Sequence, residues 1–477
     1  MAFQGPTPLE DFERALIAGG RARKDKRAGQ AADQLQRDLL EGHLVAGVSL
    51  GTHQEICDRF GIGRWACREA IGILELRGLA SARRGRGGGL VAAAPSLEHL
   101  ANLMLLHLCM KPALTNEIVA ARHGVWRAVV RKLVATACFP TDIAEYSANP
   151  DAAAPSAASR ETSLLSWLAS RTGSAGLTFL CRLLTAIYDG CGRFPAAGAG
   201  ASDDDIVQAQ HALWTAICRK SLPEAQAALA DYLALTEALP LGARVSLPNL
   251  DRDAASVGSA KSARRLATRL LDQLVRLGAS ESTSLGSESE IAVRYDCNGD
   301  IVRQAVRLLE DLGVVAPQRG QAGGLTGREP DLVGIVRLVP HFLYRDMVSP
   351  EDARETIFLL KVELGACAAR RVIHEGGEGP ASQAAKAICS ARPDNPFDMI
   401  GLERGLSELS GNSILVACEL GFVISTPPTI YLGVFGAEAL KVAAQTRRIA
   451  EAISQGDPSS VEQAMLSKYG GLVGRYN

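Results

Sequence analysis

The chain has 477 residues, which is too long for one hydrophobic core and predicts about three domains, or four small ones. Apolar residues make up 47% of the sequence and charged residues 22%, a composition that excludes general disorder. The formal net charge is −1, so any nucleic-acid-binding surface has to be a local concentration of positive charge.

Cysteine usage and the lack of long apolar segments both indicate a cytoplasmic protein. The eleven cysteines are scattered, odd in number and never spaced as CxxC, a pattern typical of reduced thiols. The N-terminus is polar and then basic, without an apolar signal segment. The longest apolar stretch, 100–110, is about half the length of a membrane span, so we expect no membrane partner.

The first folded elements along the chain are three predicted helices. They follow a basic arm over residues 1–26, and the first is an amphipathic helix from Gln30 to Leu40. A short helix from Thr52 to Phe60 is next, capped by Thr52, with Glu55 three residues on. A glycine-containing turn then leads into a longer helix from Arg64 to Arg77. Helix, glycine turn and helix in this spacing let the second helix enter a DNA major groove.

Two short strands and a basic hairpin complete this region. The strands are predicted at Leu79–Ala82 and Gly89–Ala92, on either side of the run Arg83-Arg84-Gly85-Arg86-Gly87-Gly88. Such a hairpin tip is typical of a wing, whose arginines contact phosphates or the minor groove. From Arg21 to Arg86 there are 13 basic and 8 acidic residues, a local net charge of +5.

A long Ala/Leu-rich helical region follows, and then the pattern is interrupted. Residues 148–159, rich in Ala, Pro and Ser, predict an exposed loop within it. Between 239 and 259, prolines, glycines and polar residues replace the helical pattern and predict a linker.

The second half of the chain repeats the first at a constant offset of 235 residues. The matched positions run without a gap from Leu50 to Leu90 and from Leu285 to Leu325. They are Leu50, Glu55, Ile56, Arg68, Ala70, Leu74, Glu75, Gly78, Gly85, Gly88, Gly89 and Leu90, matched by Leu285, Glu290, Ile291, Arg303, Ala305, Leu309, Glu310, Gly313, Gly320, Gly323, Gly324 and Leu325. An amphipathic helix, Ala263–Leu277, precedes the second window.

The two copies differ in charge where a DNA-reading helix begins. The first copy has Arg64 there, whereas the second has Gly299 followed by Asp300, which repels phosphate. From Lys261 to Leu325 there are 9 basic and 8 acidic residues, a local net charge of only +1. We therefore predict that the first copy makes most of the DNA contacts.

These motifs resemble the GntR superfamily of bacterial regulators, in its FadR-like branch. The resemblance is carried by Cys67-Arg68-Glu69-Ala70-Ile71, Gly78-Leu79-Ala80 and Gly85-Arg86-Gly87, and again by Val302-Arg303-Gln304-Ala305-Val306 and Arg319-Gly320-Gln321. It implies a sequence-specific, DNA-binding transcription regulator that associates with the nucleoid. The residues expected at double-stranded DNA are Thr52, Gln54, Arg64, Trp65, Arg68, Arg83, Arg84, Arg86, Arg303, Arg319 and Gln321.

The resemblance also implies a mainly α-helical fold with four domains in two pairs. Each pair is a winged helix-turn-helix domain with a small β-wing, followed by an all-α bundle like the effector (FCD) domain of that branch. The expected segments are an arm at 1–26, winged helices at 27–94 and 260–328, bundles at 95–238 and 329–477, and a linker at 239–259. A small-molecule effector is expected in the bundles, with Arg122, Arg127 and His211 as candidate pocket residues.

Many such effector domains hold a divalent metal with one Asp and three His, and this set is mostly missing here. The matching positions fall on Glu161, Leu165, His211 and Tyr232 in the first copy. In the second they fall on Met399, Glu403, Thr446 and a position near Lys468, so we predict no bound metal or other cofactor.

The sequence leaves the assembly and one alternative function open. The fused copies could act as a pseudo-dimer, or two chains could form a homodimer that uses the two first copies. The alternative to DNA recognition is a protein-interaction regulator whose winged helices have lost it. Dinucleotide, P-loop, GxSxG and HExxH motifs are all absent, so we do not expect an enzyme.

Overall fold

The computed structural model describes most of the chain and is mainly helical. The described residues are 27–41, 46–83, 89–110, 115–136, 157–191, 202–237, 239, 241–243, 259–277, 283–318, 324–328, 332–391, 396–426 and 439–473. The chain divides into two compact units, and each combines segments from both halves of the sequence. Unit 1 includes Gly20–Ala113 and Arg244–His341, and unit 2 includes Leu114–Ala243 and Phe342–Asn477.

The N-terminal part of unit 1 is a winged helix-turn-helix module, which we call the first module. Its three strands form an antiparallel sheet in the order β1-β3-β2. The elements are α2 (Arg27–Glu41), β1 (Ser49–Gly51), α3 (His53–Phe60), α4 (Arg64–Leu76), β2 (Ala80–Arg83) and β3 (Gly89–Ala92). The helix-turn-helix was predicted with α3 beginning one residue earlier, and the first strand of the pair lies one residue later than predicted.

Local sequence chemistry sets the bounds of α3 and α4. The Thr52 hydroxyl accepts a hydrogen bond from the Glu55 amide, and the Glu55 carboxylate accepts one from the Thr52 amide, as the capping box predicted. Gly61 ends α3 in the left-handed region at φ 58°, which glycine adopts without strain. Helix α4 then buries Cys67, Ala70 and Leu74, which directs its opposite face outward.

The C-terminal part of unit 1, the second module, has the same order of elements. They are α12 (Ser259–Leu277), β4 (Ser284–Gly286), α13 (Glu288–Arg294), α14 (Gly299–Asp311), β5 (Val315–Pro317) and β6 (Leu325–Gly327). The strand order β4-β6-β5 repeats that of the first sheet. Gly324 lies against Gly286 as Gly89 lies against Gly51, since a Cβ would meet the glycine carbonyl oxygen at 2.8 and 2.6 Å respectively.

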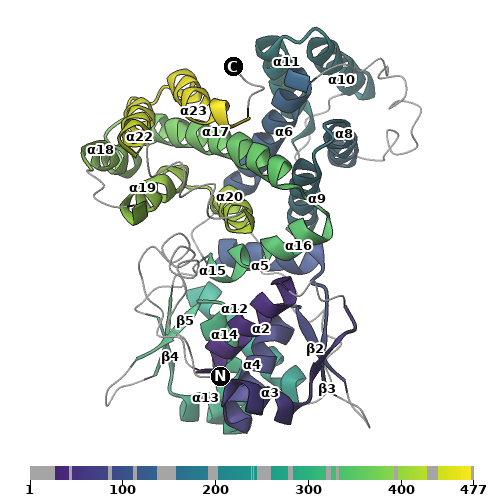
Figure 1. Cartoon of the computed structure of the whole chain (residues 1–477), viewed down its shortest axis with the longest axis vertical. Coiled ribbons are helices and arrows are strands. Elements are labelled where there is room, and N and C mark those ends of the chain that lie inside the picture. The colour runs from purple at the N-terminus through teal and green to yellow at the C-terminus, as the bar shows by residue number, and fades with distance from the viewer. Residues whose placement is uncertain are drawn as a thin grey trace. The chain divides into compact units, whose positions relative to one another are not determined.

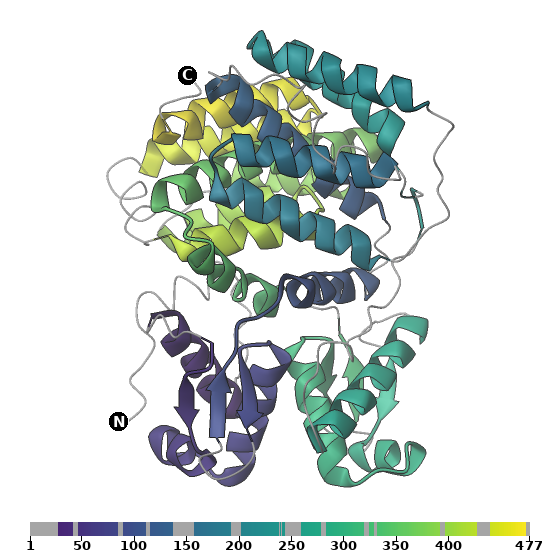
Figure 2. The same cartoon turned by 90° about the vertical axis from the view of Figure 1, so that its right-hand side faces the viewer.

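The helices of the two modules lie between the two sheets of unit 1 (Figure 1). Figure 2 shows the first module in purple and the second in teal, side by side. Two further helices belong to this unit, α5 (Leu97–Cys109) and α15 (Val333–Val336). Leu106 of α5 and the following Met110 belong to the same buried hydrophobic core as Leu270 and Leu309 of the second module. The core of the second module is therefore completed by residues from the first half of the chain.

Unit 2 is entirely helical in the residues that the structure describes. From the first half of the chain it contains α6 (Asn116–Thr136), α8 (Ala157–Arg171), α9 (Ala175–Gly190), α10 (Asp203–Cys218) and α11 (Leu222–Thr236). After α16 (Val339–Arg345), it contains α17 (Pro350–His374), α18 (Pro380–Ser390), α19 (Pro396–Glu408), α20 (Ser413–Ser425), α22 (Ala439–Ser454) and α23 (Pro458–Val473). The loop predicted over 148–159 was extended too far, because α8 already begins at Ala157; residues 148–156 lie outside the described residues.

Two long helices, α6 and α17, pack against each other in unit 2, and each has in its first turn an acidic residue that bonds to the start of a helix from the other half. Glu117 accepts a hydrogen bond from the Ser413 amide at 3.0 Å, at the start of α20. Asp352 accepts hydrogen bonds from the Gly176 amide at 2.8 Å and the Ser174 hydroxyl at 2.5 Å, at the start of α9. Both acids are favourable there because helix N-termini attract negative charge.

No helix within the described residues is both long and apolar enough to cross a membrane.

Candidate nucleic-acid interface

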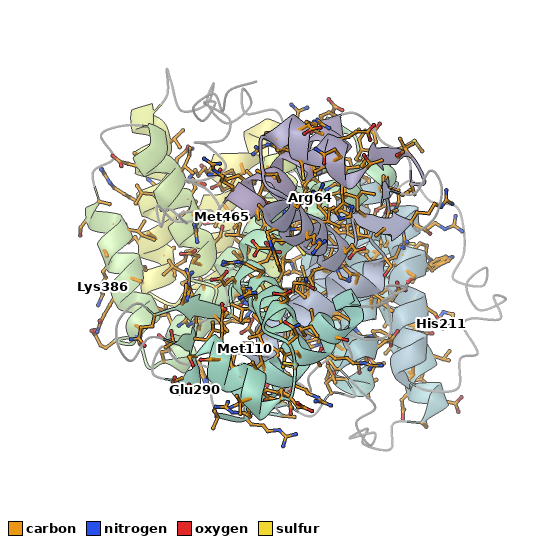
Figure 3. All side chains as sticks on the ribbon, turned by 90° about the horizontal axis from the view of Figure 1, so that it is seen from below. Arg64, Met110, His211, Glu290, Lys386 and Met465 are labelled. Atoms are coloured by element: carbon orange, nitrogen blue, oxygen red, sulfur yellow. The ribbon has the colours of Figure 1, made fainter. Side chains whose placement is uncertain are left out.

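The N-terminal end of α4 presents a basic and aromatic surface. Arg64, Trp65 and Arg68 are all exposed there, and the first turn of α4 contains no acidic residue. Figure 3 shows Arg64 on this helix. A helix N-terminus carries partial positive charge, so these side chains and the backbone favour the same kind of ligand, an anion such as a phosphate.

The helix before the turn adds two of the predicted residues. Thr52 caps α3 through its hydroxyl oxygen and is exposed. The Gln54 amide donates a hydrogen bond to Asp58 at 2.9 Å, also at the surface. Their positions agree with a role at the edge of a DNA contact.

The strand pair contributes Arg83, which is exposed at the end of β2 and pairs in register with Gly89 of β3. Arg84 and Arg86, predicted at the wing tip, lie outside the described residues. Arg319 and Gln321, the corresponding residues of the second copy, also lie outside them.

The start of α14 has different chemistry from the start of α4. Asn298 caps α14 and accepts a hydrogen bond from the Asp300 amide at 2.8 Å. Asp300 itself forms an ion pair with Arg303. The carboxylate therefore neutralises the arginine that corresponds to Arg68 of the first module.

Helices α4 and α14 contact each other, and their contacts progress in the same direction along both helices. The Arg303 guanidinium lies 5.5 Å from the centre of the Trp65 ring, Arg307 binds Glu69 at 3.3 Å, and Arg77 binds Asp311 at 2.8 Å. The two helices therefore run roughly parallel, with their N-terminal ends at the same end of unit 1.

A buried charge cluster holds the C-terminal ends of these helices together. Besides Asp311, Arg77 binds Asp33 of α2 at 2.7 Å, and Asp33 also binds Arg337 at 2.6 Å. Burial alone would lower the pKa of Arg77, but the Asp311 and Asp33 carboxylates outweigh it and raise that pKa. The arginine is therefore a permanent charge that links three segments of unit 1.

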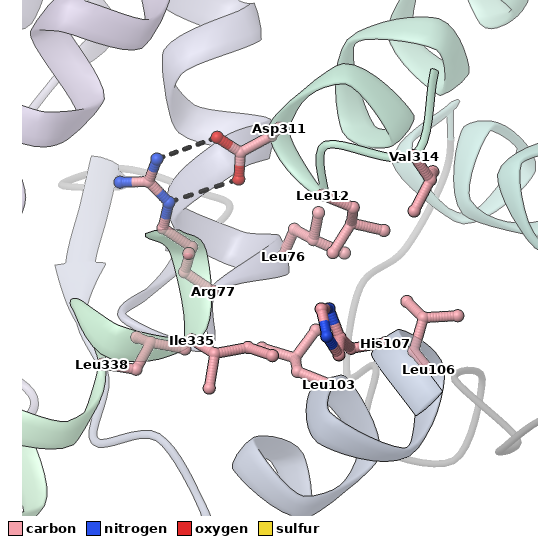
Figure 4. Close-up of a pocket in the computed structure, with 11 residues that line it drawn as sticks. Leu76, Arg77, Leu103, Leu106, His107, Asp311, Leu312, Val314, Ile335 and Leu338 are labelled. Carbon is pink, nitrogen blue, oxygen red and sulfur yellow. Dashed lines mark hydrogen bonds and ion pairs between the residues drawn. The ribbon is translucent and has the colours of Figure 1, made fainter. Parts of the chain in front are cut away.

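A small cavity lies beside this cluster (Figure 4). Its volume is about 30 Å³, and its walls are mainly Leu76, Leu103, Leu106, Leu312, Ile335 and Leu338. That is enough space for a water molecule but roughly a tenth of the smallest usual ligand pocket. Sequence reasoning missed Arg77 and Asp311, although Arg77 continues the buried positions Ala70 and Leu74 of α4, where a charge requires a partner.

The three candidate pocket residues of the first bundle lie in different surroundings. Arg122 is buried, with its guanidinium 3.9 Å from the centre of the Tyr188 ring. Arg127 binds Glu363 of α17 at 2.7 Å. His211 is exposed on α10 and is labelled in Figure 3.

The donor set at the expected metal positions of the first copy does not suit a divalent cation. Leu165 and Tyr232 are buried, His211 is exposed, and the side chain of Glu161 lies outside the described residues. A leucine provides no ligand atom, so the set lacks the donors that a divalent cation needs.

In the second half of the chain, two of the expected positions, Glu403 and Thr446, meet around Lys468, near which a further position was expected. The ammonium of Lys468 bonds to Glu403 and to the Thr446 hydroxyl, which itself donates to Glu403 at 3.0 Å. Lys361 binds Glu403 at 3.6 Å and Glu419 at 3.1 Å. Burial raises the pKa of Glu403, but Lys468 and Lys361 outweigh it and lower that pKa to about 2. Two ammonium groups supply the positive charge here. The side chain of Met399 lies outside the described residues. Within the described residues there is no cluster of three or more His, Cys, Asp or Glu able to hold a metal.

Comparison with known proteins identifies the first module. Residues 27–89 match the family described as bacterial regulatory proteins, gntR family, so this segment is a GntR-family helix-turn-helix domain. Among solved structures, Streptococcus agalactiae GntR matches with a TM-score of 0.31 and 17% identity, over 44% of this chain and 98% of that one. No curated protein matches the chain.

Proposed function

We propose that the chain is a sequence-specific transcription regulator in which the first module makes most of the DNA contacts. The observation that carries this proposal is the exposed Arg64, Trp65 and Arg68 at the start of α4, inside a GntR-family helix-turn-helix domain. Arginines at the start of a recognition helix bind phosphates and the acceptor edge of guanine.

The difference between Arg68 and Arg303 supports the asymmetry of the two modules. Arg303 is paired with Asp300. DNA that contacts Arg303 therefore either displaces the Asp300 carboxylate or lies close to its negative charge. Among the described residues, Arg68 has no carboxylate partner in its first turn or elsewhere. Arg68 is therefore the more available cation.

We further propose that the chain is a tandem duplication and acts as a pseudo-dimer, with bundles of the FadR-like effector type. The offset of 235 residues that relates the two modules also relates Glu117 to Asp352, the two acids with reciprocal caps. A reciprocal contact of this kind is characteristic of a two-fold interface.

Ion pairs between α6 and the second bundle favour pairing within one chain. The basic partners, Arg127, Arg131 and Lys132, all lie on α6, and their acidic partners, Glu363, Glu462 and Glu355, lie on α17 and α23. Pairing two copies of the first bundle would bring like charges together, which is unfavourable in a buried interface. We also propose that one of the bundles binds a small-molecule effector and that the protein is cytoplasmic.

The test is a selection from random double-stranded DNA with the full chain, followed by binding measurements over a range of salt concentrations. We expect an enriched site whose affinity falls steeply with salt. Arg64→Ala and Arg68→Ala should each weaken binding and reduce the salt slope by about one unit where a phosphate contact is lost, and Arg303→Ala should weaken it less. Arg276→Ala, at an exposed arginine of α12, is the matched control.

Failure to enrich any site would reject DNA recognition in favour of a protein-interaction regulator. Equal losses from Arg68→Ala and Arg303→Ala would reject the asymmetry.

A further inference from the structure

An exposed tryptophan lies between the arginines of the two modules. Trp65 has 48% of its surface exposed, an unusual fraction for so large an apolar side chain. The guanidinium of Arg68, on the same helix, lies 5.7 Å from the centre of its ring, and that of Arg303, on α14, lies 5.5 Å from it. Both distances are within the range of cation–π attraction.

The second module has no counterpart to this ring. At the offset of 235 residues, Trp65 corresponds to Asp300. Arg303 is therefore held by the Trp65 ring of the first module and the Asp300 carboxylate of its own helix. Of these two groups, the Trp65 ring and the Asp300 carboxylate, Arg68 contacts only the ring.

These contacts with the ring also restrict how the two arginines move. A guanidinium is planar and stacks on an aromatic face, which limits its rotamers while leaving its N–H groups available at the edge. A fixed guanidinium is the form that bonds guanine O6 and N7 simultaneously. Since one ring restricts both arginines, their orientations are coupled across the modules.

We propose that Trp65 is a positioning residue for DNA readout, which orients Arg68 and Arg303 together on neighbouring base pairs at the centre of the DNA site. This inference rests on the proposed function and adds to it the residue that couples the two modules. We therefore expect a DNA site with guanine at its centre and two unequal halves. Arg68 binds its base pair without a paired carboxylate, whereas Arg303 is also paired with Asp300.

The experiment uses the full chain and the site enriched by the wild type. Arg68→Ala and Arg303→Ala first identify, in a panel of single-base-pair changes, the base pairs at which each arginine discriminates. Trp65→Ala should then reduce discrimination at both base pairs, by about tenfold where the arginine reads guanine. Its loss of affinity should be larger on the enriched site than on non-specific DNA, because positioning affects base contacts more than phosphate contacts.

Two further variants separate positioning from a general effect. Trp65→Phe keeps an aromatic face and should retain most of the discrimination. Val293→Ala removes another exposed apolar side chain of unit 1 and should change nothing.

The outcomes are distinguishable. If the wild type enriches no site, the proposed function fails. If it does, a Trp65→Ala effect confined to the Arg68 base pair, an equal loss on all sequences, or no loss would each overturn the shared positioning role.

Discussion

Arg77 and Asp311 form a two-pronged ion pair between the C-terminal ends of α4 and α14. Arg77 Nη2 lies 2.8 Å from Asp311 Oδ1, and its Nε lies 3.3 Å from Oδ2. Both side chains are about one-tenth exposed, so water screens the pair only weakly. The two modules are therefore joined at one end by buried charge and at the other by the exposed Trp65.

The first prediction concerns Arg77→Met. The substitution removes the cation that binds both Asp311 and Asp33, and these carboxylates remain buried. Removal of one partner of a buried ion pair costs about 3–5 kcal/mol. We expect a loss of that size in the free energy of unfolding of unit 1, measured by urea denaturation. The control is Arg276→Met, whose exposed pair with Asp272 is worth about 0.5 kcal/mol or less. Similar losses in the two variants would contradict the linking role of Arg77.

The second prediction is a pH dependence that arises from His341. Burial, together with the positive charge of Arg77, lowers the pKa of His341 to about 4, below its ordinary value of 6.5. The unfolded chain therefore binds a proton below pH 6.5 that the folded chain does not bind until about pH 4. Stability is unaffected by this group above pH 6.5 and falls as the pH decreases from 6.5 towards 4, by up to about 1.4 kcal/mol per pH unit.

His341→Gln should flatten the unfolding free energy in that window, measured at several pH values between 4 and 7 by urea denaturation. His211→Gln, at an exposed histidine, should leave the slope unchanged. An unchanged slope in His341→Gln would rule out this histidine as its source.

The sequence predicted the helix-turn-helix of the first module closely because its signals are local. Thr52 and Glu55 cap a helix within three residues of each other, and Gly61 ends it. The contacts that join the modules are not local: Arg77 and Asp311 are 234 residues apart in sequence. No periodicity or cap reports such a pair, and a charged residue at a buried position of a helix gives only a general indication that a partner exists.

Local sequence patterns also do not predict how the helices of the bundles are arranged. The resemblance placed Glu403, Thr446 and a position near Lys468 in one expected site, but it did not predict that Lys468 would provide positive charge there. Burial of the cluster depends on how α17, α19, α22 and α23 pack, which follows from tertiary contacts rather than from the sequence of any one helix.

The third prediction tests the close packing of α9 against the second half of the chain. A Cβ on Gly176 would lie 2.4 Å from the Thr356 hydroxyl and 3.1 Å from the Phe422 ring. Gly176→Ala should therefore destabilise unit 2 by about 1–3 kcal/mol through overpacking, measured as a lower unfolding midpoint. Gly401→Ala, in the middle of α19 with open space around it, should instead stabilise the protein by about 0.5–1 kcal/mol. A stabilised Gly176→Ala variant would show that α9 does not pack so closely.

The fourth prediction concerns the buried charges around Glu403. Lys468→Met removes one of the two ammonium groups that bind this carboxylate, and we expect a loss of about 3–5 kcal/mol in the unfolding free energy of unit 2. Lys386→Met is the control, because Lys386 and Glu378 form an exposed pair at 3.5 Å. Zinc, manganese or a chelator should leave the melting temperature of the wild type unchanged, since lysine supplies the positive charge.

The double variant Lys468→Met/Glu403→Leu tells a charge effect from a packing effect. If the loss in Lys468→Met comes from the uncompensated carboxylate, removal of that carboxylate should recover a large part of it, as apolar replacement of a whole buried pair is often neutral. Lys361 would then retain Glu419, its partner at 3.1 Å, so the replacement does not create a new uncompensated cation. If the losses in unfolding free energy of Lys468→Met and Glu403→Leu add up in the double variant, the effect comes from lost packing. A metal-dependent melting temperature of the wild type would show that the lysines do not replace a cation.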